Sequence, residues 1–376
     1  MGDESTAYFL GAGASADAGV PLTNALLRGI ANRIRGRGGS LERFIKTFGF
    51  LEKDSTGRPP IVDLISLVDS CLKEGVPLNS FFSVRRLRDV RTKLVAELSE
   101  VVHRRRRSGT RVRMPKEALD QPGARGLRIA QYFKEFVSML RPRNRKIGRR
   151  LEPGDAIITT NYDTSIDVAL YELVYWEESG GDREYSKISD VFLGSNFRDP
   201  YEDVHALEDP EAVVDLLKLH GSLNWLYCPK CARAYVSAFG FSVRFLTRNV
   251  NDPRIRWELT CWCGYFPLEP MIIAPSVFQD VINPHLRSIW INAYEILENA
   301  DRWVFVGYSL PLEDVAVRSL LHRAMSGRRH REGEPPRIEV VCPPEDIDNL
   351  RPRYVNLFGK SVRFVGKRFS DYVYNR

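Results

Sequence analysis

The chain has 376 residues, of which 43% are hydrophobic and 27% charged, and its formal net charge is +7. This composition is typical of a globular protein and excludes a disordered or fibrous chain. No apolar run approaches the roughly 18 residues that a membrane-spanning helix needs, and the acidic start is unlike a signal peptide, so we expect a soluble, cytoplasmic protein. The basic excess predicts a surface that attracts anions such as dinucleotides, nucleic acid or an acidic partner.

The first predicted unit is a strand, a tight turn and a helix. The apolar run 7–10 leads into a glycine-rich turn, 11–16, and then into a helix-compatible stretch over about residues 15–30. The turn, Gly-Ala-Gly-Ala-Ser-Ala, fits G-x-G-x-x-A in the context where backbone N–H groups and the helix N-terminus bind a pyrophosphate. A plain strand–helix turn is the alternative. The acidic residue of a dehydrogenase is absent about 20 residues later, which disfavours hydride transfer.

Residues 33–150 predict a helical, basic insertion. Apolar residues recur at helical spacing around Ile61 and Val68, between arginine-rich tracts at 104–107 and 141–150. A third tract lies at 328–331. We interpret the tracts as solvated charged faces rather than nucleic-acid platforms, because aromatic residues are not interleaved with the arginines.

The strand pattern returns in the second half of the chain. Runs at 156–160, 213–219, 271–274, 303–306 and 338–341 are short and β-rich. Strands separated by helical patterns predict an α/β fold with a Rossmann-like, doubly wound and mostly parallel sheet. Ligands of such sheets bind outside the carboxyl ends of the strands.

Polar residues follow three of these runs. Asn161 and Asp163 come after the first, where a helix cap is the alternative role. His220 ends the second and is a candidate general base, because histidine exchanges protons near neutral pH. Gly307 and Ser309 follow the fourth and suit a ribose or adenine contact, with a simple turn as the alternative.

Four of the six cysteines form a spaced cluster, Cys228-x-x-Cys231 and Cys261-x-Cys263. Four thiolates complete a closed tetrahedral zinc shell, which is structural rather than catalytic. The second pair and the long gap are unusual for zinc, and free thiols are the alternative. Six cysteines in a chain of 376 residues do not make a secreted disulfide scaffold, and the other two cysteines stand apart from the cluster.

Together these motifs resemble the sirtuin superfamily. The glycine turn with Gly19-Val20-Pro21 resembles its Gly-Ala-Gly-Ile-Ser and Gly-Ile-Pro segments, and Thr160-Asn161-Tyr162-Asp163 resembles its Thr-Gln-Asn-Ile-Asp. His220-Gly221 resembles its catalytic His-Gly, and Gly307-Tyr308-Ser309-Leu310 its Gly-Thr-Ser-Leu. The resemblance implies that NAD is bound, with the phosphates at Gly11, Ala12, Gly13 and Ser15, the nicotinamide ribose at Asn161 and Asp163 beside Thr160, and the adenosine side at Gly307 and Ser309. It implies that the catalytic residues are His220, as the base, Asn161 and Asp163, and that the four clustered cysteines bind zinc.

Two departures separate the chain from sirtuin deacylases. Pro21 is not followed by an acidic-aromatic-arginine segment, and residues 268–275 do not resemble the strand that pairs with an acyl-lysine peptide. These features resemble the bacterial sirtuin-like NADases of anti-phage defence. That resemblance implies NAD⁺ hydrolysis to nicotinamide and ADP-ribose, and a homo-oligomer or a partner such as an ATPase, an Argonaute or a sensor protein. An NAD-dependent protein deacylase and a non-catalytic subunit that binds NAD, ADP-ribose or nucleic acid are the alternatives.

The expected organisation has three parts. A sirtuin-type NAD-binding domain is formed by residues 1–32, 151–222 and 265–376. Residues 33–150 form the helical insertion, which is the expected contact surface for an oligomer or partner, and residues 223–264 form a small zinc-type module.

Overall fold

The computed structural model describes residues 4–48, 61–104, 110–111, 128–141, 143–144, 154–170, 212–236, 243, 246, 251–273 and 283–375. Two of the arginine tracts therefore lie mostly outside the described residues: residues 105–107 of the tract at 104–107, and residues 145–150 of the tract at 141–150. No described helix is both long and apolar enough to cross a membrane.

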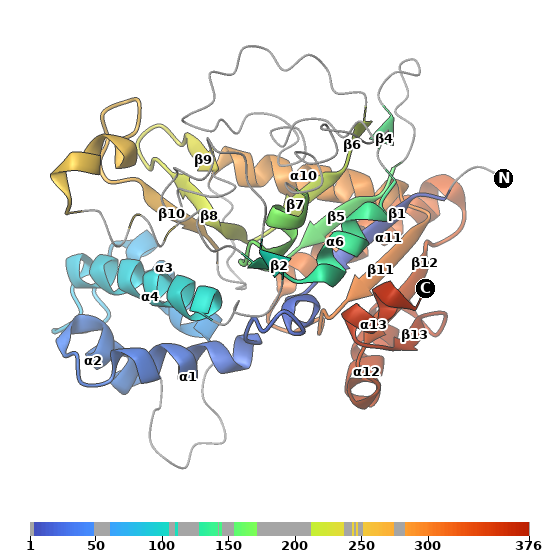
Figure 1. Ribbon diagram of the computed structural model, residues 1–376, viewed down its shortest axis with the longest axis horizontal. Helices are drawn as coiled ribbons and strands as arrows, with labels where there is room; N and C mark the ends of the chain where they lie inside the picture. The colour runs from blue at the N-terminus through green and yellow to red at the C-terminus, as the bar shows by residue number, and fades with distance from the viewer. Residues whose placement is uncertain are drawn as a thin grey trace.

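A six-stranded parallel sheet forms the centre of the molecule (Figure 1). Its spatial order is β13-β12-β11-β1-β5-β7, so the chain builds one half outward from β1 and then returns to build the other half. The order changes direction between β1 and β11, which is the switch point where doubly wound sheets bind ligands. The predicted fold class is confirmed. The strands of this sheet are β1 (Thr6–Leu10), β5 (Ala156–Thr159), β7 (Asp215–Lys218), β11 (Arg302–Val306), β12 (Arg337–Cys342) and β13 (Arg363–Gly366).

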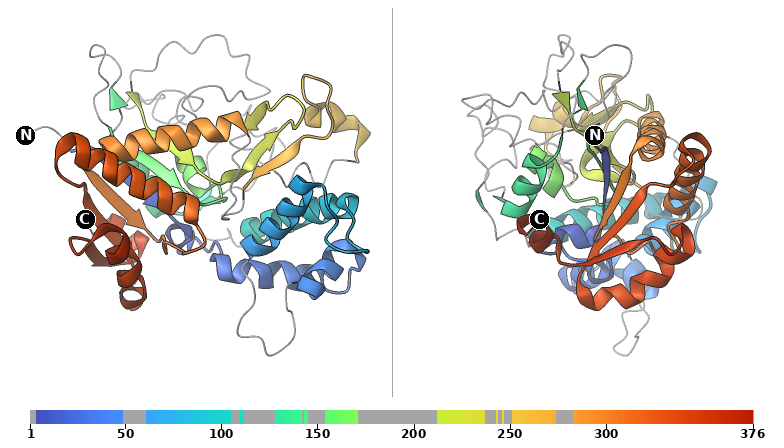
Figure 2. Two further views of the ribbon diagram at one scale, coloured as in Figure 1. Left: turned by 180° about the vertical axis from the view of Figure 1, so that it is seen from behind. Right: turned by 90° about the vertical axis from the view of Figure 1, so that its right-hand side faces the viewer.

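Helices cover both faces of this sheet. From behind, α10 (Pro284–Asn299) and α11 (Val315–Glu332) lie across one face (Figure 2). The opposite face carries α6 (Gln131–Ser138) and α13 (Phe369–Tyr374). The remaining elements of this part are η3 (Pro344–Asp346), α12 (Ile347–Phe358), a helix at 165–170 and the two-residue strands β2 (Thr110–Arg111), β3 (Arg128–Ile129), β4 (Arg143–Asn144) and β6 (Ala212–Val213).

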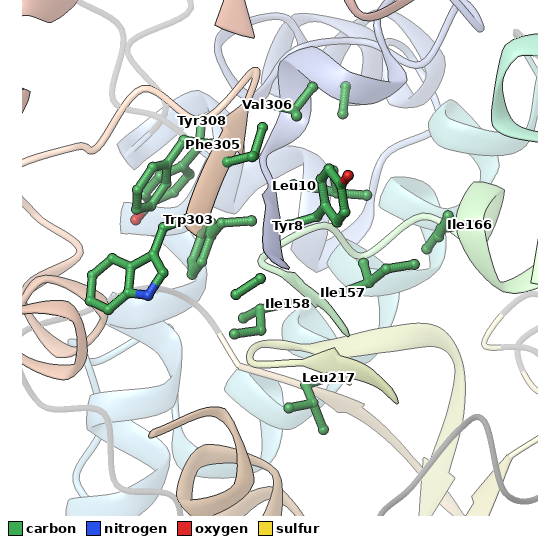
Figure 3. Close-up of a cluster of buried hydrophobic side chains, with 14 of the residues drawn as sticks. Tyr8, Leu10, Ile157, Ile158, Ile166, Leu217, Trp303, Phe305, Val306 and Tyr308 are labelled. Atoms are coloured by element: carbon green, nitrogen blue, oxygen red, sulfur yellow. The ribbon is translucent and has the colours of Figure 1, made fainter. Parts of the chain in front are cut away.

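Apart from the edge strand β13, the strands are largely buried on both faces, which explains their mostly apolar sequences. Large side chains from neighbouring strands fill the core, including Tyr8, Ile158 and Phe305 (Figure 3). On the α6 side, the Tyr8 ring meets Phe136 edge to face with a centroid separation of 5.0 Å.

The N-terminal helix begins later than the sequence predicts. The glycine turn forms the short 3-10 helix η1 (Ala12–Ser15), and α1 runs only over Thr23–Ile34. Gly19 has a φ of 80°, and Pro21 follows it, so neither residue continues a helix through this segment. The prediction of a helix from residue 15 was therefore wrong, and residues 16–22 form a loop instead.

A second core joins α1 to three further helices, α2 (Gly39–Phe48), α3 (Ile61–Glu74) and α4 (Val84–Arg104). The same core continues into a small antiparallel sheet, β10-β8-β9, through residues such as Leu226 and Tyr235. The strand predicted at 271–274 belongs to this small sheet rather than to the parallel one. The module consists of β8 (Gly221–Tyr227), β9 (Ala234–Val236), η2 (Pro253–Leu259) and β10 (Glu269–Ile272).

Candidate functional site

A cavity of about 640 Å³ opens at the carboxyl ends of the parallel strands. This volume is within the range of sites for small molecules and cofactors, about 300 to 1,000 Å³. The loops after β1, β5, β7, β11 and β12 all reach it. Of the residues expected at the site, eight line the cavity: Ala12, Gly13, Thr160, Asn161, Asp163, His220, Gly307 and Ser309.

Gly11 and Ser15 are buried and do not line the cavity themselves. The Gly11 amide donates to the carbonyl of Val306 at 2.9 Å, so the first loop is tied to the end of the neighbouring strand. A Cβ on Gly11 would lie 2.5 Å from the Cα of Tyr308. This glycine is therefore required for the close packing of two loops.

Asn161 and Asp163 are held by hydrogen bonds to the glycine loop. The Asn161 Nδ2 donates to the carbonyl of Gly11 at 2.9 Å, and Ser15 Oγ donates to Asp163 Oδ2 at 2.9 Å. Asp163 Oδ1 accepts from the Ser165 amide at 2.8 Å, as in a helix cap. Asp163 therefore combines the capping geometry with a bond that fixes the position of Ser15.

A fully buried ion pair lies beneath this loop. The Lys218 Nζ is 2.8 Å from Asp167 Oδ2, and the side chains of both residues have zero exposure. Lys218 also donates to the carbonyl of Asp163 at 2.7 Å, and Asn224 donates to Asp167 at 3.2 Å. These bonds hold the loop that carries Asn161, and sequence patterns gave no signal for them.

His220 faces a buried carboxylate. Its Nε2 is 3.6 Å from Oδ1 of Asp314, and both side chains are 2% exposed. The other carboxylate oxygen of Asp314 accepts a hydrogen bond from the Tyr308 hydroxyl at 2.8 Å. Burial and the nearby Asp314 raise the pKa of Tyr308 well above its ordinary value, so this hydroxyl keeps the proton that it donates. Sequence reasoning missed Asp314, whose only signal is its place seven residues after a glycine that ends a strand.

Backbone hydrogen bonds and two aromatic residues fix the position of His220. Its carbonyl accepts from the Ile273 amide at 2.9 Å, and the preceding carbonyl, of Leu219, accepts from Trp290 Nε1 at 2.9 Å. Tyr162 donates to the carbonyl of Ile273 at 2.7 Å, and burial raises the pKa of its hydroxyl. These contacts tie the end of β7 to β10 and α10.

The cavity lining is more acidic than the whole chain. The arginine among its basic residues, Arg368, is 3.6 Å from Asp17 and 3.2 Å from Glu345, so its charge is shared with carboxylates. The net charge of +7 is therefore not concentrated here. The charged lining residues are the acidic Asp17, Asp163, Glu313, Asp314, Glu345 and Asp346 and the basic Lys367 and Arg368.

The four clustered cysteines meet at the small sheet. All four sulfur atoms lie within 4.8 Å of one another. The separations are 3.6 Å from Cys228 to Cys263 and 3.4 Å from Cys231 to Cys261. Tetrahedral zinc with bonds of about 2.3 Å places its sulfur ligands about 3.8 Å apart. The donor set and the spacing therefore fit one metal ion.

The described arginine tract takes part in structural ion pairs. Arg328 lies 2.9 Å from Asp301, and Arg331 lies 3.0 Å from Glu332. The side chain of Arg328 is 11% exposed and that of Arg331 is 40% exposed, so the two arginines differ in their contact with solvent.

The comparisons with known proteins identify one family. The profile of the SIR2-like domain matches residues 155–359. Among solved structures, a Sir2 homologue in complex with NAD is 14% identical with a TM-score of 0.42, covering 98% of this chain and 86% of that chain. A structure of Sir2Tm bound to a propionylated peptide is 12% identical with a TM-score of 0.39, covering 98% and 90%. No curated protein matches the chain.

Proposed function

The chain belongs to the SIR2-like family, and on that premise we propose that it is an NAD⁺ glycohydrolase that releases nicotinamide and ADP-ribose. The observation that carries the proposal is the convergence of Gly13, Asn161 and His220 on one cavity at the switch point of the sheet. A dinucleotide would extend across this point, as ligands of doubly wound sheets do.

The two halves of the substrate would meet different loops. In our proposal the pyrophosphate lies against the turn at Ala12 and Gly13, and the adenosine half lies beside Gly307 and Ser309. The Gly13 amide already donates to the carbonyl of Gly307 at 2.9 Å, so other donors of this turn would bind the phosphates.

The nicotinamide half would lie beside Asn161 and His220. Cleavage of its glycosidic bond moves positive charge onto the ribose, and a cavity with several carboxylates suits an oxocarbenium-like transition state. His220 would accept a proton from a water molecule or a ribose hydroxyl, and Asn161 would orient the reacting group. Because Asp163 is bonded to Ser15 and Ser165, we assign it the role of holding this loop.

A zinc ion bound by the four cysteines would be structural. The four thiolates fill a tetrahedral shell and leave no position for a substrate. We propose that this ion fixes the small sheet, which in turn supports the end of β7.

Product analysis tests the proposed reaction. Purified protein is incubated with NAD⁺ over a range of protein concentrations, and the products are identified by NMR. His220→Ala and Asn161→Ala should each lower kcat by about 10²-fold or more, the typical contribution of a positioned base or orienting group. His322→Ala and Asn356→Ala remove exposed residues of the same types and are the matched controls. Undiminished cleavage in the two folded site variants would contradict the assignment.

The same samples separate the alternatives. An acyl-lysine peptide that loses its acyl group in step with nicotinamide release would establish a deacylase instead. Tight binding of ADP-ribose without turnover at any concentration would favour a binding subunit, and nucleic-acid binding that weakens steeply with salt would identify its ligand.

We also propose a role in anti-phage defence, in which the activity depletes NAD⁺ in infected cells. The support is the sequence resemblance to sirtuin-like defence NADases. A toxic activity must be restrained before infection, so we propose a homo-oligomer or a partner protein, in contact with the helices of residues 33–150. NAD⁺ content measured after infection should fall in cells with the wild-type protein and stay constant with His220→Ala.

A further inference from the structure

Asp314 carries a buried oxygen atom that the fold leaves without a hydrogen bond. Its Oδ1 is inaccessible to solvent and has no hydrogen-bond partner among the residues that the structure describes. The whole residue is 1% exposed. An unsatisfied carboxylate oxygen in such a place costs on the order of 1 to 3 kcal/mol or more, so this arrangement calls for a functional reason.

Helix capping does not explain this carboxylate. Asp314 occupies the N-cap position of α11, where aspartate ordinarily accepts from the helix amides. Here its side chain forms no such bond. It turns toward the cavity instead, with Oδ2 fixed by Tyr308 and Oδ1 directed at Nε2 of His220 across 3.6 Å. This separation is too long for a hydrogen bond.

The other charged groups around His220 are engaged elsewhere. On β7, Lys218 pairs with Asp167, and on the β5 loop Asp163 accepts from Ser15. The hydroxyl of Tyr162 has a raised pKa because of burial and stays neutral. On α11, the positive charge of Arg318 lowers the pKa of the Tyr308 hydroxyl, against the larger effects of burial and Asp314. Within the described part of the chain, Arg318 forms no ion pair with Asp314. Asp314 is therefore the carboxylate positioned to interact with the ring of His220.

We propose that Asp314 is a positioning residue that receives the N–H formed when His220 accepts a proton. The inference rests on the proposed function for the identity of the proton donor. An O–H bond of water or of a ribose hydroxyl breaks, its electron pair stays on oxygen, and an Nε2–H bond forms. The new N–H then donates to Oδ1 of Asp314, which compensates the positive charge on the ring. Tyr308 holds the carboxylate in place for this step.

This role predicts a loss in turnover rather than in binding. Asp314→Asn preserves the shape and removes the charge, so kcat for NAD⁺ should fall by about 10²-fold or more. The affinity for ADP-ribose, measured by calorimetry, should change by less than about twofold. The double variant with His220→Ala should be no slower than His220→Ala alone, because the two residues act as one unit. Asp348→Asn, which removes an exposed carboxylate outside the cavity, is the matched control.

A second measurement is independent of turnover. The ring signals of His220, labelled with ¹⁵N and identified by their loss in His220→Ala, are followed through a pH titration. They should titrate at lower pH in Asp314→Asn than in the wild type, because the protonated ring loses its anionic neighbour. Should Asp314→Asn fail to fold, Tyr308→Phe is the substitute, because it retains the carboxylate of Asp314 and removes the hydrogen bond that holds it. The His220 titration should then move in the same direction by a smaller amount.

Different results would contradict the proposed NAD⁺ hydrolysis and the role of Asp314. Absence of NAD⁺ cleavage by the wild type would contradict the proposed function, and the titration would still decide the role of Asp314. Cleavage with kcat unchanged in Asp314→Asn, or rate losses that multiply in the double variant, would overturn the inference alone. An identical His220 titration in both proteins would overturn it as well.

Discussion

The amide of Gly13 donates a hydrogen bond to the carbonyl oxygen of Gly307 at 2.9 Å, so the two glycine loops of the cavity are bonded directly to each other. A Cβ on Gly13 would lie 2.7 Å from the Cα of Gly307, and a Cβ on Gly307 would lie 2.4 Å from the Ala14 amide nitrogen. The glycines are thus needed for contact between the loops as well as for access by a ligand. Displacing one loop would displace the other.

Gly307→Ala should damage both stability and ligand binding. Gly307 has a φ of 58°, which costs an L-residue roughly 1 to 2 kcal/mol, and the added Cβ would also collide with the first glycine loop. Gly38→Ala shares the positive φ, at 70°, but its Cβ meets nothing within 4 Å. Thermal unfolding should show a clearly larger decrease in Tm for Gly307→Ala, and ADP-ribose binding should weaken only in that variant. Equal decreases would mean that the loop contact adds nothing beyond the backbone strain.

Lys218→Met should destabilise the protein strongly. Removal of one member of a fully buried ion pair leaves Asp167 without its charged partner and typically costs about 3 to 5 kcal/mol. The free energy of unfolding, measured in urea, should fall by this order. The double variant with Asp167→Leu removes both charges and should recover part of the loss. A single variant as stable as wild type would show that the pair does not contribute to the fold.

Metal analysis tests the cysteine cluster. Wild-type protein should contain one zinc ion per chain, and Cys231→Ser should lose it with a lowered Tm, because one of the four clustered ligands is removed. Cys71→Ser is the control, since Cys71 is a buried cysteine outside the cluster and should leave the metal content unchanged. Equal metal content in both variants, or its absence from wild-type protein, would contradict the zinc assignment.

Glu42 should contribute to acid sensitivity. An ion pair with Lys46 and the amides of Gly36 and Gly38 lower the pKa of this carboxyl from 4.5 to about 2. Because the folded state binds the proton less readily, this stabilisation is complete above pH 4.5 and is lost as the pH falls toward 2. Glu42→Gln should therefore flatten the decline in unfolding free energy across that interval, when urea unfolding is measured at successive pH values. Glu334→Gln changes an exposed glutamate and should leave the decline as in wild type.

Local sequence patterns predicted the strands that are buried on both faces. β1, β5 and β11 are buried on both faces, so their apolar runs stand out. β13 was missed because it lies at the sheet edge, and its four residues are exposed or half-buried. The first helix was predicted too early because its apolar spacing outweighed Gly19 and the following proline, which end regular structure locally.

At the candidate site, too, the sequence predicted some residues and missed others. Asn161, His220 and Gly307 were predictable as neighbours, since parallel strands bring their carboxyl ends to one edge. Lys218 and Asp314 gave no such signal, because a lysine in a strand and an aspartate before a helix have common structural roles. Their importance depends on contacts between distant segments that only folding creates.

The second hydrophobic core prevents a clean separation of the helical segment from the rest of the chain. Side chains of α1, α3 and α4 pack in one cluster with those of the small antiparallel sheet. Arg91 of α4 also donates to the carbonyl of Ile272, next to the residue whose carbonyl accepts from Tyr162 beside the cavity. A cassette cut at residues 33 and 150 would leave α1 behind and expose apolar surface on both pieces. The helices therefore cannot be exchanged as an independent module unless the replacement matches both α1 and the small sheet.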